Sequence, residues 1–282
     1  MQGKHPIPGV SHTLAVASGK GGVGKTTVTV NLALGLQALG LRVGIFDADI
    51  FGPNVPLMLG VHRKAAYQGY VPVVRRSEAR PYIPPLDRYG LRVMSMGLIV
   101  SEDQVINPSA EVAGQVVVRT LRDALWGELD ILLIDLPPSA DQPQQDLVAH
   151  IKMDGAVIVT TPQDLSLLDS SRSLQMYAQA GVPIIGLVEN MSYFVCPHCG
   201  ERHEIFQHTE NWRPAVLNDA PLLGRIPLTA EISKGITREH PLMADASHTG
   251  AGQAQAEAFM GIARNVKDRL DQTLNHKEHE GR

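Results

Sequence analysis

A glycine-rich segment with two lysines, residues 18–27, contains the residue types most suited to binding phosphate. It reads Ser-Gly-Lys-Gly-Gly-Val-Gly-Lys-Thr-Thr, and residues 19–26 fit the spacing G-x-x-x-x-G-K-[ST]. Glycines let the backbone wrap a phosphate chain so that several N–H groups point inward. We therefore expect a nucleotide to contact the loop residues Gly19, Lys20, Gly21, Gly22, Val23, Gly24, Lys25, Thr26 and Thr27.

Two side chains at the end of this loop have chemical roles that follow from their type. Lys25 supplies a compact positive charge for the β- and γ-phosphates, and the Thr26 hydroxyl is the expected Mg²⁺ ligand. The simpler interpretation is a strand-to-helix turn with incidental residues. An apolar strand at 14–17 and a helix pattern at 26–39 give the motif its required context and disfavour that interpretation.

Acidic residues follow two further apolar runs. Asp47 and Asp49 come directly after residues 43–46, and Asp135 follows residues 131–134. A lone aspartate at a strand end is commonly a turn former. Two acidic strand ends beside a phosphate loop predict instead Mg²⁺ chemistry around Asp49 and Asp135.

The two cysteines of the chain, Cys196 and Cys199, stand together in a C-x-x-C pattern. Two thiolates cannot complete a four-coordinate zinc site or a cubane cluster. The pair could be a dithiol redox switch, or it could bind zinc with His198, His203 or His208. Alternatively, two copies of the chain could supply four thiolates to one [4Fe-4S] cluster across a two-fold axis. The residues alone leave zinc and iron–sulfur open.

The elements that must position these residues alternate between apolar strands and helices. This alternation predicts an α/β fold, a three-layer P-loop NTPase with a mostly parallel central sheet and helices on both faces. The strands are expected at 14–17, 43–46, 91–94, 131–134, 156–159 and 184–188, and the helices at 26–39, 111–126 and 165–180.

We expect residues 1–282 to form a single domain. Residues 1–12 are an extended lead-in, and Gly and Pro between 51 and 90 predict a long loop region with one small hairpin. The remaining parts are a C-x-x-C insertion at 193–215, a packing helix at 250–274 and a disordered end at 275–282.

Composition limits the classes of partner. The chain has 282 residues and a formal net charge of -4, which gives no electrostatic reason to expect nucleic acid as a partner. No apolar run is long enough to span a bilayer, and the first residues lack a signal-peptide core. We therefore expect a cytoplasmic protein that uses neither a membrane nor nucleic acid.

The chain resembles a known family from about residue 9 to residue 237. The Lys-Gly-Gly-Val-Gly-Lys-Thr-Thr run resembles the deviant phosphate loop of the SIMIBI class of ATPases. More specifically, four further segments resemble the Mrp (ApbC-like) family of iron–sulfur carriers: Phe46–Pro56, Gly155–Asp164, Glu189–Gly200 with its two cysteines, and Leu223–Leu228.

The resemblance implies roles for individual residues. Lys20 would reach the nucleotide of a partner subunit and act on the γ-phosphate, and Asp47 would position or activate the attacking water. Asp49 would lie near Mg²⁺, and Asn190 would recognise adenine, which favours ATP over GTP. Lys20 and Asp47 are thus the catalytic candidates of a slow, Mg²⁺-dependent ATPase.

The resemblance also implies a function: a homodimeric, ATP-hydrolysing scaffold that holds a bridging [4Fe-4S] cluster at Cys196 and Cys199 and transfers it to apo iron–sulfur client proteins. His203 and His208 would then be loop residues rather than ligands, and zinc could replace the cluster. The alternatives are a spatial-positioning ATPase of the ParA or MinD type and a zinc-stabilised interaction module with a relic nucleotide site.

Three segments depart from the family pattern. Residues 106–110 replace a Trp-Arg-Gly-Pro-Met run, and Thr229 stands where an aspartate often follows Ile-Pro-Leu. Ser139 and Asp141 replace two glycines of the segment that should sense the γ-phosphate. Because glycine gives such a switch its flexibility, these replacements bear on turnover and partner signalling more than on nucleotide binding.

Overall fold

We analysed the protein as a computed structural model. The structure describes residues 4–61, 74–75, 81–99, 109–138, 142–162, 175–196, 198–205, 220–229, 239–245 and 250–280, and every structural statement below concerns these residues.

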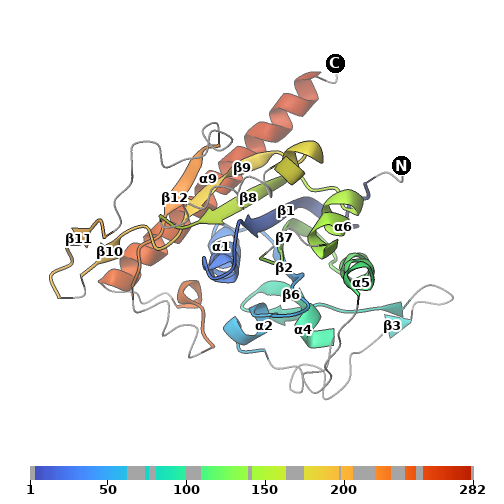
Figure 1. Ribbon diagram of the computed structural model, residues 1–282, viewed down its shortest axis with the longest axis horizontal. Coiled ribbons are helices and arrows are strands. Elements are labelled where there is room, and N and C mark those ends of the chain that lie inside the picture. Colours follow the sequence, from blue (N-terminus) through green and yellow to red (C-terminus); the bar gives the residue numbers. More distant parts are fainter. Residues whose placement is uncertain are drawn as a thin grey trace.

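A central sheet of eight strands runs through the described part of the chain, in the order β12-β9-β8-β1-β7-β2-β6-β5 (Figure 1). All neighbouring strands are parallel except β5 and β6. The strands are β1 Val10–Ser18, β2 Val43–Asp47, β5 Leu86–Arg88, β6 Leu91–Ser95, β7 Leu129–Asp135, β8 Gly155–Thr160, β9 Ile184–Glu189 and β12 Leu222–Arg225.

Helices cover both faces of the sheet, because strand side chains alternate between two apolar cores. In β7, Ile131 and Leu133 belong to one core and Leu132 and Ile134 to the other. The first core lies under α1 (Lys25–Ala38), α9 (Ala251–Glu280) and the short η2 (Leu242–Ala244), and the second under α5 (Ala110–Asp123) and α6 (Gln142–His150). The predicted α/β fold is confirmed.

Smaller elements connect the layers. Two short helices, α2 (Val55–Met58) and α4 (Met96–Ile99), follow β2 and β6. The expected small hairpin is the pair β3 (Val74–Arg75) and β4 (Pro81–Tyr82). A second hairpin, β10 (Phe194–Val195) with β11 (Arg202–His203), projects from one end of the molecule, at the left of Figure 1.

Several expected boundaries differ from the structure. The strand β1 begins at Val10, inside the expected lead-in, and the helix expected at 111–126 ends at Asp123. Trp126 instead leaves the helix and is buried with its ring edge-on to Phe46. Of the helix expected at 165–180, residues 165–174 lie outside the described residues, and 175–179 are helical.

The C-terminal helix is longer than predicted. We expected it to end at Leu274 and the remaining residues to be disordered, but α9 continues to Glu280. The prediction was wrong because no glycine or proline interrupts the sequence between these positions, so the helix can continue up to Gly281. Within the described part of the chain, no helix is long and apolar enough to cross a membrane.

Candidate functional site

The phosphate loop lies between β1 and α1, at the carboxyl end of the sheet. Gly22 and Gly24 both have φ of 83°, a left-handed conformation that favours glycine. At Gly24 a side chain would also be blocked, because a Cβ atom would lie 2.3 Å from the Nδ2 atom of Asn190. These backbone requirements explain why the segment needs glycine here.

A cavity of about 380 Å³ opens over this loop, which is the size range of small-molecule sites. Acidic, amide and apolar side chains line it together with the glycines. It is lined by Ser18, Lys20–Thr27, Asp49, Asn54, Leu57, Met58, Pro138 and Met191.

Asp135 is the centre of the polar network beneath the loop. Its Oδ1 atom lies 2.7 Å from Lys25 Nζ and accepts a hydrogen bond of 2.7 Å from the Thr29 hydroxyl. Its Oδ2 atom accepts a hydrogen bond of 2.7 Å from the Thr26 hydroxyl. Asp135 thus holds both the expected phosphate lysine and the expected metal ligand, and together these oxygens form a hard donor set that suits Mg²⁺.

Asp47 lies beside Asp135, because β2 and β7 pair these two residues in register. It is fully buried and accepts hydrogen bonds from the Ser95 hydroxyl at 2.9 Å and the Val55 N–H at 3.2 Å. Burial, followed by repulsion from Asp135, raises the pKa of Asp47 to about 7, and the charge of Lys25 opposes this rise. A carboxyl group with such a pKa can exchange protons at neutral pH.

Asp49 has different surroundings. Its Oδ1 atom accepts hydrogen bonds from the backbone N–H groups of Phe51 and Gly52, at 3.1 and 2.9 Å, and its side chain lines the cavity. Asp49 therefore lines the cavity, whereas Asp47 is fully buried beside Asp135 and does not line it. The roles that we expected for the two acids stay predictions.

The variant Asp47→Asn should reduce the pH dependence of stability in the nucleotide-free protein. Because the pKa of Asp47 rises from 3.8 to about 7 on folding, the folded state retains a proton that the unfolded chain releases. The free energy of unfolding should therefore fall as the pH rises through this window, by up to about 1.4 kcal/mol per pH unit. Urea unfolding at several pH values measures the slope, and an equally steep slope in the variant would contradict the assignment.

Asn190 is held under the phosphate loop. Its side-chain amide donates a hydrogen bond of 2.8 Å to the backbone carbonyl of Val23. The next residue, Met191, lines the cavity and has a left-handed backbone with φ of 53°. The adenine contact expected of Asn190 stays a prediction, since the structure engages this amide with the loop itself.

Lys20 is exposed on the open side of the loop, and the Ser18 hydroxyl donates a hydrogen bond of 3.0 Å to its backbone carbonyl. An exposed lysine at the mouth of the cavity is compatible with a role toward a second subunit. That role stays a prediction.

The two cysteines lie at the tip of the β10–β11 hairpin, and both are free thiols. Backbone hydrogen bonds of 2.9 Å close this tip, from Cys196 N to Glu201 O and from Gly200 N to Cys196 O. Hydrogen bonds from the backbone N–H groups of Cys199 and His198 lower the pKa of Cys196. Thiolate is the form of cysteine that binds metal.

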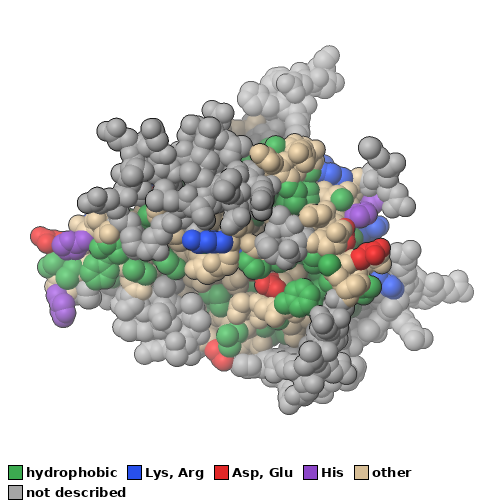
Figure 2. Space-filling model, viewed as in Figure 1, with side chains coloured by type: hydrophobic (Ala, Val, Ile, Leu, Met, Phe, Trp, Pro, Cys, Tyr) green, Lys and Arg blue, Asp and Glu red, His purple; other side chains and the backbone are tan. Residues whose placement is uncertain are grey.

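Histidine and acidic side chains gather around the thiols, at the left end of the surface in Figure 2. The expectation that His203 is a loop residue was wrong: it lies on β11, where it pairs with Phe194. Its ring nitrogen, the Cys199 sulfur and a Glu201 oxygen all lie within 4.8 Å of one another. His208 lies outside the described residues.

Sequence reasoning missed Thr29, Ser95 and Glu201. Thr29 could have been found from its position one helical turn after Lys25, on the same face of α1. Ser95 ends β6 beside Asp47, as the parallel register requires. Glu201 stands two residues after Cys199. That spacing alone does not indicate a metal ligand, and it becomes informative only once the strand β11 is known to follow Glu201.

The departures from the family pattern have partial explanations. The Thr229 hydroxyl donates a hydrogen bond of 2.6 Å to the Oε1 atom of the fully buried Gln255 on α9, so it fastens that helix to the sheet. Ser109 begins α5 and accepts a hydrogen bond of 3.4 Å from the Val112 N–H. Residues 106–108, Ser139 and Asp141 lie outside the described residues.

Comparison with known proteins agrees with this geometry. Residues 9–267 match the family described as ParA: NUBPL iron-transfer P-loop NTPase. An iron–sulfur cluster carrier protein of Deinococcus radiodurans is 40% identical over 94% of this chain and 71% of its own length.

Two solved structures share the fold. A nucleotide-binding protein of Archaeoglobus fulgidus in complex with ADP, with cobalt found in it, has a TM-score of 0.67 and 33% identity, covering 85% of this chain and 90% of that one. The septum site-determining protein MinD of Pyrococcus horikoshii, complexed with Mg-ADP, has a TM-score of 0.61 and 24% identity, with coverage of 93% and 98%. At that identity, MinD shows similarity of fold alone.

Proposed function

The chain belongs to the NUBPL iron-transfer P-loop NTPase family, and from this premise we propose that it is an ATP-dependent carrier of iron–sulfur clusters that delivers them to apo-proteins. One observation carries the proposal: a cavity opens over the phosphate loop, and Met191 in its lining is followed a few residues later by the two free thiols of the β10–β11 hairpin. Among relatives, the Deinococcus protein is a named carrier of clusters.

The residues under the loop are arranged to receive ATP with Mg²⁺. Lys25, whose Nζ atom lies 2.7 Å from Asp135, would bind the β- and γ-phosphates. Asp135 and Thr26 would hold Mg²⁺, which when bound would neutralise charge that develops on the phosphates. Asp49, which lines the cavity, is the acid best placed to orient a water molecule.

The hairpin is suited to hold a cluster as cargo only in a dimer. Each chain offers two thiolates from Cys196 and Cys199, and an all-cysteine [4Fe-4S] cluster requires four. A homodimer with the two hairpin tips at its axis meets this requirement. Because Cys199 is exposed and Cys196 half-buried, the cargo would stay accessible to an acceptor.

A short backbone segment connects the two features. Asn190 holds the phosphate loop, and Phe194 begins the hairpin that carries the cysteines. Between them, the N–H of Ser192 donates to the carbonyl of Ile226 at 2.9 Å, which ties the segment to the end of β12. A change in the loop on nucleotide binding can therefore move the hairpin and alter the exposure of its cargo.

The variant Lys20→Ala should leave ATP affinity nearly unchanged and lower the rate of hydrolysis, by roughly a hundredfold. The reason is that Lys20 would stabilise charge that develops only in the transition state, on the nucleotide of the partner subunit. Calorimetry measures the affinity and phosphate release measures the turnover. Equal turnover in wild type and variant would rule out the role across the interface.

Transfer itself provides the direct test of the carrier function. Protein loaded with cluster under anaerobic conditions is mixed with an apo [4Fe-4S] acceptor, and the acceptor's activity is followed with and without ATP. We expect faster activation than by free iron and sulfide, and a response to ATP that Lys25→Ala removes. Activation no faster than by free iron and sulfide would refute the carrier function. The cytoplasmic location expected from the sequence stays a prediction.

A further inference from the structure

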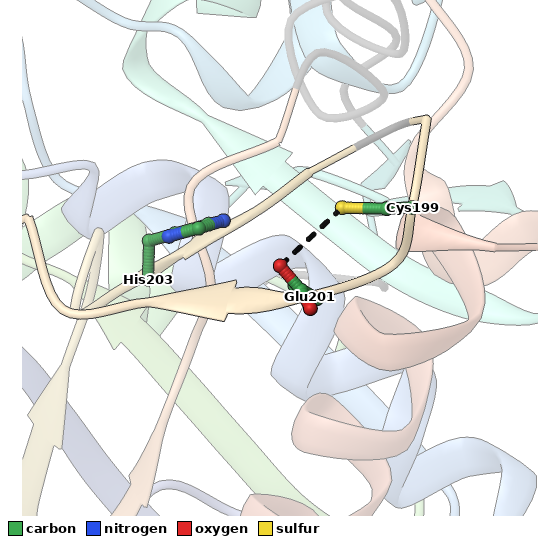
Figure 3. Close-up of side chains that lie close together, drawn as sticks. All are labelled: Cys199, Glu201 and His203. Carbon is green, nitrogen blue, oxygen red and sulfur yellow. Dashed lines mark hydrogen bonds between the residues drawn. The ribbon is translucent and has the colours of Figure 1, made fainter.

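Three different metal-binding side chains meet on one face of the β10–β11 hairpin. Cys199, Glu201 and His203 each direct a ligand atom toward the same point, and these atoms lie within 4.8 Å of one another (Figure 3). The Cys199 sulfur is 3.8 Å from the Oε2 atom of Glu201. All three residues are exposed, so an ion can reach them without any opening of the fold.

The backbone explains why these three converge. Residues two apart in an extended segment point to the same side, which places Glu201 and His203 together. Arg202 between them points elsewhere: its guanidinium carbon lies 3.8 Å from the ring centre of Tyr193, and its Nε atom donates to Glu204 at 2.7 Å. The only positive charge within this stretch is therefore kept away from the three ligands.

We propose that a single subunit binds one divalent transition-metal ion through the Cys199 thiolate, the Glu201 carboxylate and the His203 imidazole. Sulfur, oxygen and nitrogen donors together suit Zn²⁺, Fe²⁺ and Co²⁺ rather than Mg²⁺ or Ca²⁺. One thiolate and one carboxylate balance the two charges of the ion. Three protein ligands leave a fourth position for water or for an incoming sulfur ligand.

The distances require only small adjustments. Ligands bound at roughly 2.0–2.3 Å around a tetrahedral ion stand about 3.3–3.8 Å apart. The ligand atoms of Cys199, Glu201 and His203 lie up to 4.8 Å apart. Because all three side chains are exposed, rotation of the side chains can bring these atoms to bonding separation while the strand backbone stays in place. The ring of His203 is already supported by Phe194, whose ring centre is 6.4 Å away at an angle of 34°.

This site differs from the cluster site of the proposed function, although both use Cys199. The cluster requires Cys196 and a second subunit, whereas the single ion requires Glu201 and His203 and no partner. The single ion and the cluster therefore compete for Cys199. Only this competition rests on the proposed function; the single-ion site does not. A subunit holding one ion would be the state before cluster assembly, or a state blocked by the wrong metal.

Anaerobic titration with Co²⁺ tests the site, because a thiolate–cobalt bond gives a charge-transfer absorption band that reports sulfur ligation directly. We expect one Co²⁺ per subunit, bound by the monomeric fraction and displaced by Zn²⁺. Glu201→Gln and His203→Gln should each weaken binding about tenfold or more, and Cys199→Ala should remove the band. The matched controls Glu204→Gln and His198→Gln should bind as the wild type does.

Cluster reconstitution separates this proposal from the carrier function. Cys196→Ala should lose the cluster and keep the cobalt band, while Glu201→Gln and His203→Gln should keep the cluster. Binding of ATP by every variant checks the fold. The proposal is overturned if Cys196→Ala removes the cobalt band, or if neither Glu201→Gln nor His203→Gln changes cobalt affinity. Failure of the wild type to take up a cluster would count against the carrier function alone.

Discussion

Replacing Lys25 with alanine is expected to weaken the binding of ATP–Mg²⁺ at least about a hundredfold. The loop offers phosphate its backbone N–H groups and this lysine, which is buried at the base of the cavity. A charge-assisted contact from a buried lysine to phosphate contributes far more than a neutral hydrogen bond, and the variant loses it entirely. Isothermal titration calorimetry of the nucleotide-free protein measures the difference.

A loss of binding must be separated from a loss of fold. Lys25 neutralises Asp135, so the variant leaves that carboxylate with only the hydroxyl donors Thr26 and Thr29. The variant should therefore be less stable than the wild type, because a buried carboxylate has lost its cation. Far-ultraviolet circular dichroism reports whether the fold persists.

The matched control is Lys20→Ala, which removes the other lysine of the same loop. Lys20 is exposed, so its loss leaves the buried network around Asp135 intact. We expect this variant to bind ATP nearly as the wild type does. Unchanged affinity in Lys25→Ala would contradict the assignment of residues 19–27 as the nucleotide loop.

The sequence was sufficient to predict which acidic residues lie together beside the phosphate loop. Asp47 and Asp135 end two buried runs, and the carboxyl ends of parallel strands lie at one edge of a sheet. The structure pairs them in register on β2 and β7. The prediction succeeded because strand runs, the glycine loop and the parallel arrangement all follow from local patterns.

The sequence was insufficient to tell which of two neighbouring acids faces the cavity. Asp47 is the last residue of β2, so the strand turns it into the interior. Asp49 lies beyond the strand, where side chains no longer alternate between the two faces of the sheet. Its orientation depends instead on the turn in which its side chain accepts hydrogen bonds from the backbone N–H groups of Phe51 and Gly52.

In the β10–β11 hairpin, too, the sequence pattern was insufficient to predict which side chains lie together. The C-x-x-C spacing identifies Cys196 and Cys199, but the position of Glu201 depends on the register in which β10 pairs with β11. That register is set by the hydrogen bonds between Cys196 and Glu201 and between Gly200 and Cys196. His198 is closer in sequence to Cys199 than His203 is, and only the paired strands show that His203 joins the ligand group.

Replacing either Cys196 or Cys199 with alanine is expected to abolish cluster uptake. These residues are the only thiols of the chain, so a dimer offers four thiolates and either variant offers two. Wild type should take up about four irons per dimer, with matching sulfide and the broad visible absorption of an iron–sulfur centre. Anaerobic reconstitution followed by iron and sulfide analysis measures this ratio.

Further consequences follow if the cluster bridges two subunits. Each variant should dimerise more weakly than the loaded wild type, because the shared ligands no longer connect the hairpins. ATP binding should survive, since neither cysteine lines the nucleotide cavity. Sedimentation of loaded and unloaded protein measures the first effect, and calorimetry measures the second.

The decisive control is His198→Gln, which alters the residue inside the C-x-x-C loop and leaves both thiols. It should reconstitute as the wild type does, because the backbone N–H that supports Cys196 is unchanged by the substitution. Iron uptake by a Cys196→Ala, Cys199→Ala double variant that equals the wild type would contradict the carrier function. In that case the iron would be bound non-specifically. The remaining interpretations of the hairpin would be the single-ion site and a dithiol redox switch.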